Sequence, residues 1–280
     1  MSLAMKGRIC LVTGASSGIG KITALELAKM GTTAVLVCRN KDRGERARAE
    51  IIQASGNAAV DLMLCDLSSQ RQVRSLASEF KGRYKKLHVL LNNAAAVPGH
   101  RTITEDGLET QLAVNHLAPF LLTHLLLDVL RKSAPSRVIN VSSGMYKTAS
   151  LDFNNLQGEK SYRPMKMYAK TKLLNIYFTY ELAQRLEGTG VTVNCLAPGF
   201  TATSLGRDFS PLSRFVMKTF AHKKEIGAQT SIYLASSPEV ERVTGKYFEK
   251  MKDTPTSPPT HDKDIARRVW EVSQLLTGPA

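Results

Sequence analysis

The residues with the clearest chemical potential are Tyr168 and Lys172, which lie four positions apart in the segment YAKTK. A helix is expected over Met165–Leu186, and residues four apart on a helix project from the same face. A phenol has a pKa of about 10 and carries protons poorly at neutral pH, but a neighbouring ammonium group favours the phenolate and lowers that pKa. The pair therefore predicts a tyrosine that acts as general acid or base, although this spacing also occurs in ordinary surface pairs.

A glycine-rich turn near the amino terminus predicts a site for a dinucleotide. Residues 13–20 read TGASSGIG and place three glycines between an expected strand, Arg8–Thr13, and an expected helix, Ile19–Met30. Glycine allows a tight turn and a close approach of the backbone, and the positive end of the helix faces a phosphate charge. The spacing is GxxxGxG rather than the common GxGxxG, and a purely structural turn is the alternative.

The residue after the second expected strand, Val35–Cys38, predicts which dinucleotide binds. An NAD enzyme places Asp or Glu there, against the 2′-hydroxyl of the ribose. This chain has Arg39, whose guanidinium group suits a 2′-phosphate, so NADP(H) is the expected cofactor. Asp42 lies nearby but is expected to open the following helix, and the alternative for Arg39 is a plain surface arginine.

These residues need a scaffold, and the sequence predicts one in which strands and helices alternate. Further strands are expected at Leu62–Cys65, Val89–Leu91, Val138–Val141 and Val191–Leu196, and further helices at Lys41–Ala54, Gln70–Tyr84 and Gly107–Arg131. Short apolar strands separated by helices indicate a parallel sheet covered on both faces. The expected fold is α/β, a single doubly wound Rossmann-type domain with a mostly parallel sheet and helices on both faces.

That domain is expected to span residues 1–253. Residues 254–280 are expected to form a linker, which begins TPTSPPT, and a C-terminal helix, Asp262–Leu276, docked on the same domain. Trp270 is the expected packing anchor of this helix.

Further motifs follow in a fixed order after the glycine-rich turn. They are Cys65-Asp66-Leu67, Asn92-Asn93-Ala94, Asn115, Ser143, the segment YAKTK and Pro198-Gly199. In this combination the chain resembles the short-chain dehydrogenase/reductase family over nearly its whole length. It looks most like the retinol dehydrogenase branch, in phrases such as VNHL at 114–117 and RVWEVS at 268–273. It departs from that pattern in having Ala95 where the family usually has glycine, and in lacking the N-terminal membrane segment common in the branch.

The resemblance implies roles for four catalytic residues. Tyr168 exchanges a proton with the substrate oxygen, and Lys172 also holds the nicotinamide ribose. Ser143 hydrogen-bonds the reacting carbonyl oxygen, and is preferred to its neighbour Ser142 because it matches the second serine of the family's strand-end motif. Asn115 holds a water in a proton relay to the lysine, with a satisfied polar group in the core as the alternative.

The resemblance also implies a set of cofactor contacts. They are Gly14, Ser16, Ser17, Gly18, Ile19, Gly20, Arg39, Asp66, Leu67, Asn93, Ala94, Tyr168, Lys172, Pro198, Gly199, Thr201 and Thr203. Asp66 is expected to meet the adenine; its alternative is to cap a helix, a task for which Ser68 competes.

The expected function is that of an NADP(H)-dependent oxidoreductase that interconverts a lipophilic aldehyde or ketone, retinal-like or aliphatic, and its alcohol by hydride transfer. A helix expected after Ser210-Pro211 carries an apolar face that predicts a roof for the substrate, with Met145 on the opposite side, and ordinary core packing is the alternative. The roof residues are Leu212, Phe215, Val216 and Phe220. The alternatives for the whole protein are a steroid or other ring-ketone reductase and a non-catalytic NADP(H)-binding regulator, which would not need a proton donor.

Composition limits the other classes of function. The chain has 280 residues, 43% of them hydrophobic, which suits a globular protein with a sizeable core. Its net charge is +14, but basic and acidic residues are interspersed and no aromatic platform accompanies them, so nucleic acid is not an expected partner. No HExxH pattern is present, so no metal is expected, and the four cysteines lie far apart inside apolar runs, as in a reduced interior.

The sequence also limits location and assembly. Met1–Gly7 is too short for a signal peptide and no run of about 18 apolar residues occurs, so the expected location is cytoplasmic or peripheral at a membrane surface. The basic residues of the protein are expected to bind a membrane surface only weakly. The apolar helix at Gly107–Arg131 resembles the family's dimer surface, which leaves a homodimer open.

Overall fold

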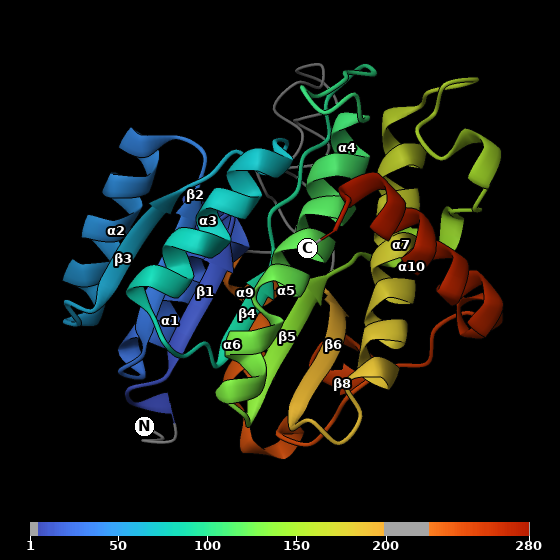
Figure 1. Ribbon diagram of the computed structural model, residues 1–280. Coiled ribbons are helices and arrows are strands. Elements are labelled where there is room, and N and C mark those ends of the chain that lie inside the picture. The colour runs from blue at the N-terminus through green and yellow to red at the C-terminus, as the bar shows by residue number, and fades with distance from the viewer. Residues whose placement is uncertain (1–4, 199–223, 280) are drawn as a thin grey trace.

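An eight-stranded sheet runs through the computed structural model, which describes residues 5–198 and 224–279 (Figure 1). The strands are β1 (Ile9–Thr13), β2 (Thr33–Cys38), β3 (Val60–Leu64), β4 (Val89–Asn92), β5 (Ser136–Val141), β6 (Val191–Ala197), β7 (Lys246–Glu249) and β8 (Lys252–Asp253). All neighbouring strands among these residues pair in parallel except β7 and β8. Every residue of β5 and β6 is buried, as expected for strands covered on both faces.

The strand order explains where a ligand can bind. The order is β3-β2-β1-β4-β5-β6-β7-β8, so the chain winds outward from β1 in one direction and from β4 in the other. The connections at the carboxyl ends of β1 and β4 therefore diverge and leave a crevice between them. The prediction of a doubly wound Rossmann-type domain is confirmed.

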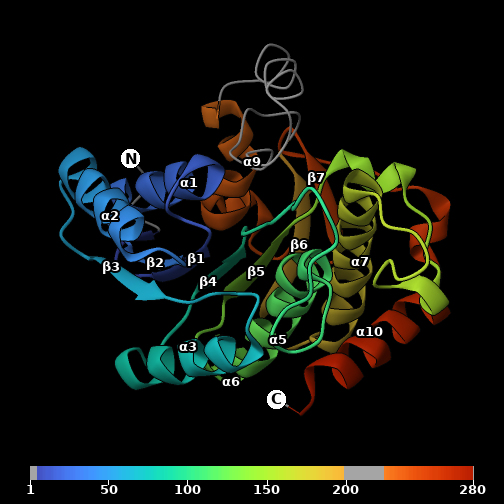
Figure 2. The same ribbon diagram turned by 90° about the horizontal axis from the view of Figure 1, so that it is seen from above.

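Helices cover both faces of the sheet (Figure 2). One face carries α1 (Gly18–Lys29), α2 (Lys41–Ser55) and α9 (Lys224–Ser236). The other carries α3 (Gln70–Arg83), α5 (Ala118–Leu125), α6 (Leu127–Lys132) and α7 (Pro164–Arg185), with α10 (Lys263–Thr277) packed on the outside of α7. The short elements are α4 (Thr110–Leu112), η2 (Ala113–Leu117), η3 (Gly144–Thr148), η4 (Phe153–Asn155), η6 (Pro238–Val240) and η7 (Pro258–His261). No helix of the described ranges is long and apolar enough to span a bilayer.

The helix expected over Gly107–Arg131 is shorter at its start and interrupted. It begins at α4, where the Glu109 carboxylate caps it, and then passes through η2, a π-helical turn, before α5 and α6. Pro119 explains the interruption, because it has no N–H to donate to the carbonyl of Asn115, four residues earlier. The site asparagine therefore lies in an irregular turn and not in a regular helix.

Apart from the short helical turns, three elements of the described residues lie outside the sequence predictions. They are α9, β7 and β8; β7 extends the parallel sheet beside β6, and β8 folds back on it as a hairpin. The C-terminal helix was expected and is present as α10.

Trp270 anchors α10 as expected. Its ring centroid lies 5.2 Å from that of Phe120 on α5, and the Arg185 guanidinium of α7 stacks 4.1 Å from the ring centroid. Part of the helix whose apolar character left a homodimer open therefore packs against the chain's own C-terminal helix, and a homodimer stays a prediction.

Candidate active site

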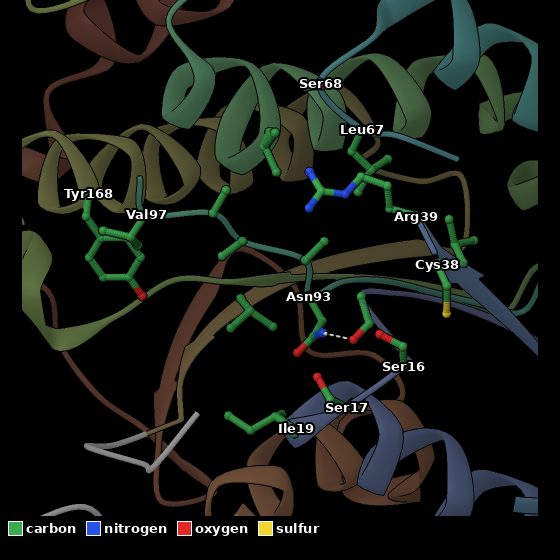
Figure 3. A pocket seen from close by; sticks show the side chains of 18 of the residues that line it. Ser16, Ser17, Ile19, Cys38, Arg39, Leu67, Ser68, Asn93, Val97 and Tyr168 are labelled. Carbon is green, nitrogen blue, oxygen red and sulfur yellow. Dashed lines mark hydrogen bonds between the residues drawn. The ribbon is translucent and has the colours of Figure 1, made fainter. Parts of the chain in front are cut away.

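A cavity of about 380 Å³ lies at the carboxyl ends of the parallel strands, across the point where the strand order reverses. Residues that follow β1, β2, β3, β4, β5 and β6 line it. Figure 3 shows Tyr168 at one end, Cys38 and Arg39 at the other, and Asn93 between them. One elongated ligand could therefore contact both ends of the cavity, which differ in their chemistry.

The glycine-rich turn forms one side of the cavity because two glycines let it close against the loop after β4. A Cβ on Gly14 would lie 2.9 Å from the Cα of Ala94, and one on Gly20 would lie 2.5 Å from the Nδ2 of Asn93. Gly18, with φ of +61°, faces open space: nothing lies within 4 Å of its Cβ position. Because the first N–H groups of a helix have no helical partners, this space at the start of α1 suits a phosphate.

Thr13 and Asn93 tie the same two loops together by hydrogen bonds. The Thr13 hydroxyl accepts from the N–H groups of Asn93 (2.9 Å) and Ala94 (3.0 Å). The Asn93 side-chain amide donates to the Thr13 carbonyl at 2.7 Å. Asn93 thus supports the cavity wall as well as lining it.

One end of the cavity carries two arginines. Arg39 is 76% exposed and its Nη1 lies 3.9 Å from the Asp66 carboxylate. Arg43, which the sequence reading did not single out, lies in the first turn of α2 with its Nη2 3.4 Å from the Ser17 hydroxyl. The sequence could have placed Arg43, because Asn40 is a good N-cap and a helix that starts there puts Arg43 in its first turn. In the structure the Asn40 side chain accepts from the Arg43 N–H at 2.9 Å. Two guanidinium groups make this end suited to an anion.

Asp66 does not cap α3, and neither does Ser68. The Asp66 carboxylate accepts from the N–H (3.0 Å) and the hydroxyl (2.7 Å) of Ser68, and Ser69 caps the helix by accepting from the Gln72 N–H at 3.3 Å. The capping alternative is wrong for both residues because α3 begins at Gln70, so Ser69 is the residue in capping position. Asp66 lines the cavity beside Arg39.

The opposite end of the cavity gathers Ser143, Tyr168 and Lys172. Ser143 ends the connection from β5 and lies close enough to Tyr168 for its hydroxyl to lower the pKa of the phenol. The hydroxyl of its neighbour Ser142 is instead used inside the protein, because it donates to the Lys172 carbonyl at 2.8 Å. Lys172 is buried, donates from Nζ to the Val141 carbonyl at 2.8 Å, and lies 5.4 Å from the centre of the Tyr168 ring.

Burial decides the acidity of both groups. It raises the pKa of Tyr168 to about 12, against the opposing effect of the Ser143 hydrogen bond, and it lowers the pKa of Lys172 to about 7. The expectation that the lysine lowers the tyrosine pKa is wrong for this structure. Removal of water disfavours the charged form of each group, and a lysine that is half neutral at pH 7 exerts a weaker field. Tyr168 is thus protonated at neutral pH.

The Asn115 side chain is fully engaged with its neighbours. Its Oδ1 accepts from the Ala96 N–H at 2.7 Å, and its Nδ2 donates to the Ala96 carbonyl (3.0 Å) and the Thr171 hydroxyl (3.2 Å). It therefore fixes the loop after β4, where Ala96 lines the cavity, to the helix that carries Tyr168. This is the satisfied polar group that the sequence left as an alternative; the relay role stays a prediction.

Apolar side chains surround the tyrosine end of the cavity. Met145, Met165, Val97 and Val114 all line it. Met165 was not singled out, although its position three residues before Tyr168 on α7 places both on the same helix face. The expected roof between Ser210 and Phe220 lies outside the described residues.

Most of the expected site residues meet at this cavity. Those that line it are Gly14, Ser16, Ser17, Gly18, Ile19, Arg39, Asp66, Leu67, Asn93, Ala94, Ser143, Tyr168, Lys172 and Pro198. Gly20 and Asn115 support its walls from behind. Gly199, Thr201 and Thr203 fall outside the described part of the chain.

Known proteins are similar to this chain in sequence and in architecture. Residues 8–212 match the short chain dehydrogenase family. Human retinol dehydrogenase 14 is 44% identical over 293 residues, an alignment that covers 98% of this chain and 87% of that protein. The crystal structure of an uncharacterised protein from Mycobacterium paratuberculosis superimposes with a TM-score of 0.81 at 28% identity, over 98% of this chain and 94% of the other.

A short chain dehydrogenase from Escherichia coli, solved in complex with NADPH, shares the fold alone. Its TM-score is 0.69 at 24% identity, over 90% of this chain and 100% of the other.

Proposed function

The chain belongs to the short chain dehydrogenase family, and we propose that it is an NADP(H)-dependent oxidoreductase for a lipophilic aldehyde or ketone and its alcohol. Its relation to retinol dehydrogenases supports the reaction class. The observation that carries the proposal is the pairing of Tyr168 with Ser143, next to Lys172, at one end of a cavity whose other end holds two arginines.

The cavity fits the proposed cofactor. The turn at residues 14–19 would hold the pyrophosphate, since Gly18 leaves open space at the start of α1. Asp66 and Leu67 would meet the adenine. Arg39 and Arg43 would hold a 2′-phosphate, which supports NADP(H) over NAD(H). In the family's manner, Lys172 would hold the nicotinamide ribose.

The residues at the tyrosine end supply the proton chemistry of carbonyl reduction. When bound, NADPH supplies a hydride to the carbonyl carbon. The Tyr168 hydroxyl donates its proton to the carbonyl oxygen, so that the C=O bond becomes CH–OH. The Ser143 hydroxyl hydrogen-bonds the same oxygen as negative charge develops on it. Because its pKa is raised to about 12, Tyr168 carries the proton needed for reduction at neutral pH.

The apolar lining supports a lipophilic substrate. Met145, Met165, Val97 and Val114 offer no charge and no strong hydrogen bond near the tyrosine. Methionine side chains are flexible and adapt to irregular apolar ligands. A retinal-like or aliphatic chain suits this lining, and a steroid or other ring ketone is the second candidate with the same mechanism.

A peripheral position at a membrane surface stays a prediction that rests on the net charge of +14.

Turnover of a carbonyl series tests the proposal. The purified protein is mixed with NADPH or NADH and with n-aldehydes from propanal to decanal, all-trans-retinal, or cyclohexanone, and nicotinamide absorbance is followed. We expect NADPH to be preferred and kcat/KM to rise with chain length, by at most about fourfold per methylene, since each contributes about 0.8 kcal/mol.

Each other outcome points elsewhere. A flat or falling profile from short to medium chains would remove the apolar pocket from the account. Preference for the ring ketone would favour the second candidate. Tight NADPH binding without turnover of any carbonyl would favour a regulator.

A further inference from the structure

The C-terminal helix reaches the active site through a line of buried hydrogen bonds. Ser273 Oγ of α10 lies 2.8 Å from Nε2 of His116. The Nδ1 of His116 lies 3.0 Å from Oδ1 of Asn175 on α7, and the Nδ2 of Asn175 donates to the main-chain carbonyl of Asn115 at 2.9 Å. All four side chains are at most 3% exposed. The line thus connects a helix at the end of the chain to the turn that holds the site asparagine.

The Asn115 carbonyl needs this partner because the helix does not supply one in the α-helical pattern. Its α-helical donor would be the N–H of residue 119, which is Pro119. The Asn175 amide donates to this carbonyl from another helix, in place of the N–H that Pro119 lacks. The turn around Asn115 is therefore held by side chains that come from α7 and α10.

The line has a direction that fixes each proton. Since the Asn175 amide nitrogen donates to Asn115, its oxygen faces His116, and Nδ1 of His116 must carry hydrogen. Burial lowers the pKa of His116 to about 4, so the ring is neutral and Nε2 is an acceptor. The Ser273 hydroxyl then shares its one hydrogen between Nε2 of His116 and the Val269 carbonyl, to which it donates at 2.7 Å.

We propose that Ser273, His116 and Asn175 are positioning residues that hold Asn115, and that the C-terminal helix is thereby part of the support of the active site. Asn115 in turn grips both polar atoms of the Ala96 backbone, which lines the cavity. If the turn around Asn115 lost these hydrogen bonds, the cavity wall at Ala96 would shift relative to Tyr168. This inference rests on the proposed function for its kinetic readout, but not for its structural one.

A matched pair of substitutions on α10 tests the proposal. Ser273→Ala removes the hydroxyl that donates to His116. Thr277→Val removes another buried hydroxyl, one turn later on the same helix, which donates to the main-chain carbonyls of Ser273 (2.8 Å) and Gln274 (3.5 Å) and not to His116. We expect Ser273→Ala to lower kcat for decanal reduction about three- to tenfold, the value of one buried hydrogen bond, with KM and NADPH affinity unchanged. Thr277→Val should leave kcat unchanged. Ser273→Thr, which keeps a hydroxyl at this position, should have a kcat close to that of the wild type.

Two measurements on the protein without cofactor keep the test independent of turnover. Nitrogen-15 shifts should show His116 protonated at Nδ1 and not at Nε2. Hydrogen exchange at the Ala96 N–H should be faster in Ser273→Ala than in Thr277→Val.

The outcomes separate the two proposals. Equal kcat in Ser273→Ala and Thr277→Val, or the opposite His116 tautomer, would overturn the positioning role. A wild-type protein that reduces no carbonyl would instead overturn the proposed function, while the tautomer and the exchange rates would still decide the role of α10.

Discussion

Lys172 gives the sharpest quantitative test of the site's electrostatics. Burial lowers its pKa from 10.5 to about 7, whereas in the unfolded chain the lysine keeps its ordinary value. Between these two values the unfolded state binds more protons than the native state, so the free energy of unfolding must rise with pH. The penalty of burying a charged lysine is full below pH 7 and fades above it.

The size of the effect follows from that shift. Each pH unit between the two pKa values contributes up to about 1.4 kcal/mol, and the gain from pH 7 to pH 9 is about 2 kcal/mol because the lysine is already half neutral at pH 7. Lys172→Met keeps the apolar stem and removes the titrating group. We expect the free energy of unfolding of the variant, minus that of the wild type, to fall by about 2 kcal/mol over this range.

Urea unfolding of the cofactor-free protein, followed by circular dichroism at pH 7, 8 and 9, measures this difference. Lys166→Met, which removes an exposed lysine from the same helix, is the matched control and should show a constant difference. A pH-independent difference for Lys172→Met would refute the reasoning, because it would mean that the amine keeps its charge in the folded protein.

Three further predictions concern the two ends of the cavity and its glycine turn. Arg39→Asp should lower the preference for NADPH over NADH. Arg43→Gln should weaken NADPH binding about 10- to 100-fold and leave NADH binding unchanged, because charge-assisted hydrogen bonds to the 2′-phosphate are lost. An unchanged cofactor preference in both variants would refute the 2′-phosphate site. Met165→Ser should lower kcat/KM for decanal more than for propanal, and equal losses would place the alkyl chain elsewhere. Gly20→Ala should lower the melting temperature, since its Cβ would lie 2.7 Å from the carbonyl oxygen of Gly14. The control Gly82→Ala, which has open space around its Cβ in α3, should raise the free energy of unfolding by about 0.5–1 kcal/mol. A Gly20→Ala protein as stable as wild type would contradict the close packing of the glycine turn.

The parts of the site that were predictable are those that depend on local backbone geometry. The glycine turn of residues 13–20 and the four-residue spacing of Tyr168 and Lys172 express constraints between near neighbours, and the structure places them as expected. The alternating strands of the sheet were predictable for the same reason. Ser143 could be separated from Ser142 only by resemblance, and the structure adds the reason: the Ser142 hydroxyl is used by α7.

The β7–β8 hairpin was not predictable because its signals are unusual. β7 has only four residues, and the turn places Lys250 and Met251 at φ of +49° and +63°, where glycine or asparagine would be the usual residue. Without such a residue, nothing local marks the hairpin.

The other features that the sequence did not predict depend on tertiary contacts. The link between Ser273 and His116 joins residues 157 positions apart, so no window of sequence contains it. The pKa of Tyr168 depends on how completely the fold excludes water around it, and the spacing to Lys172 carries no information on that.

Single-turnover oxidation of NADPH by wild type and Tyr168→Phe tests whether Tyr168 supplies the proton. The substitution keeps the ring and deletes the hydroxyl that lies beside Ser143. With decanal as substrate, we expect nearly unchanged NADPH affinity and a rate lower by about 10² to 10⁴, the usual contribution of a general acid. A Tyr168→Phe protein that reduces decanal at a substantial fraction of the wild-type rate would show that another group moves the proton, and would overturn the role proposed for Tyr168.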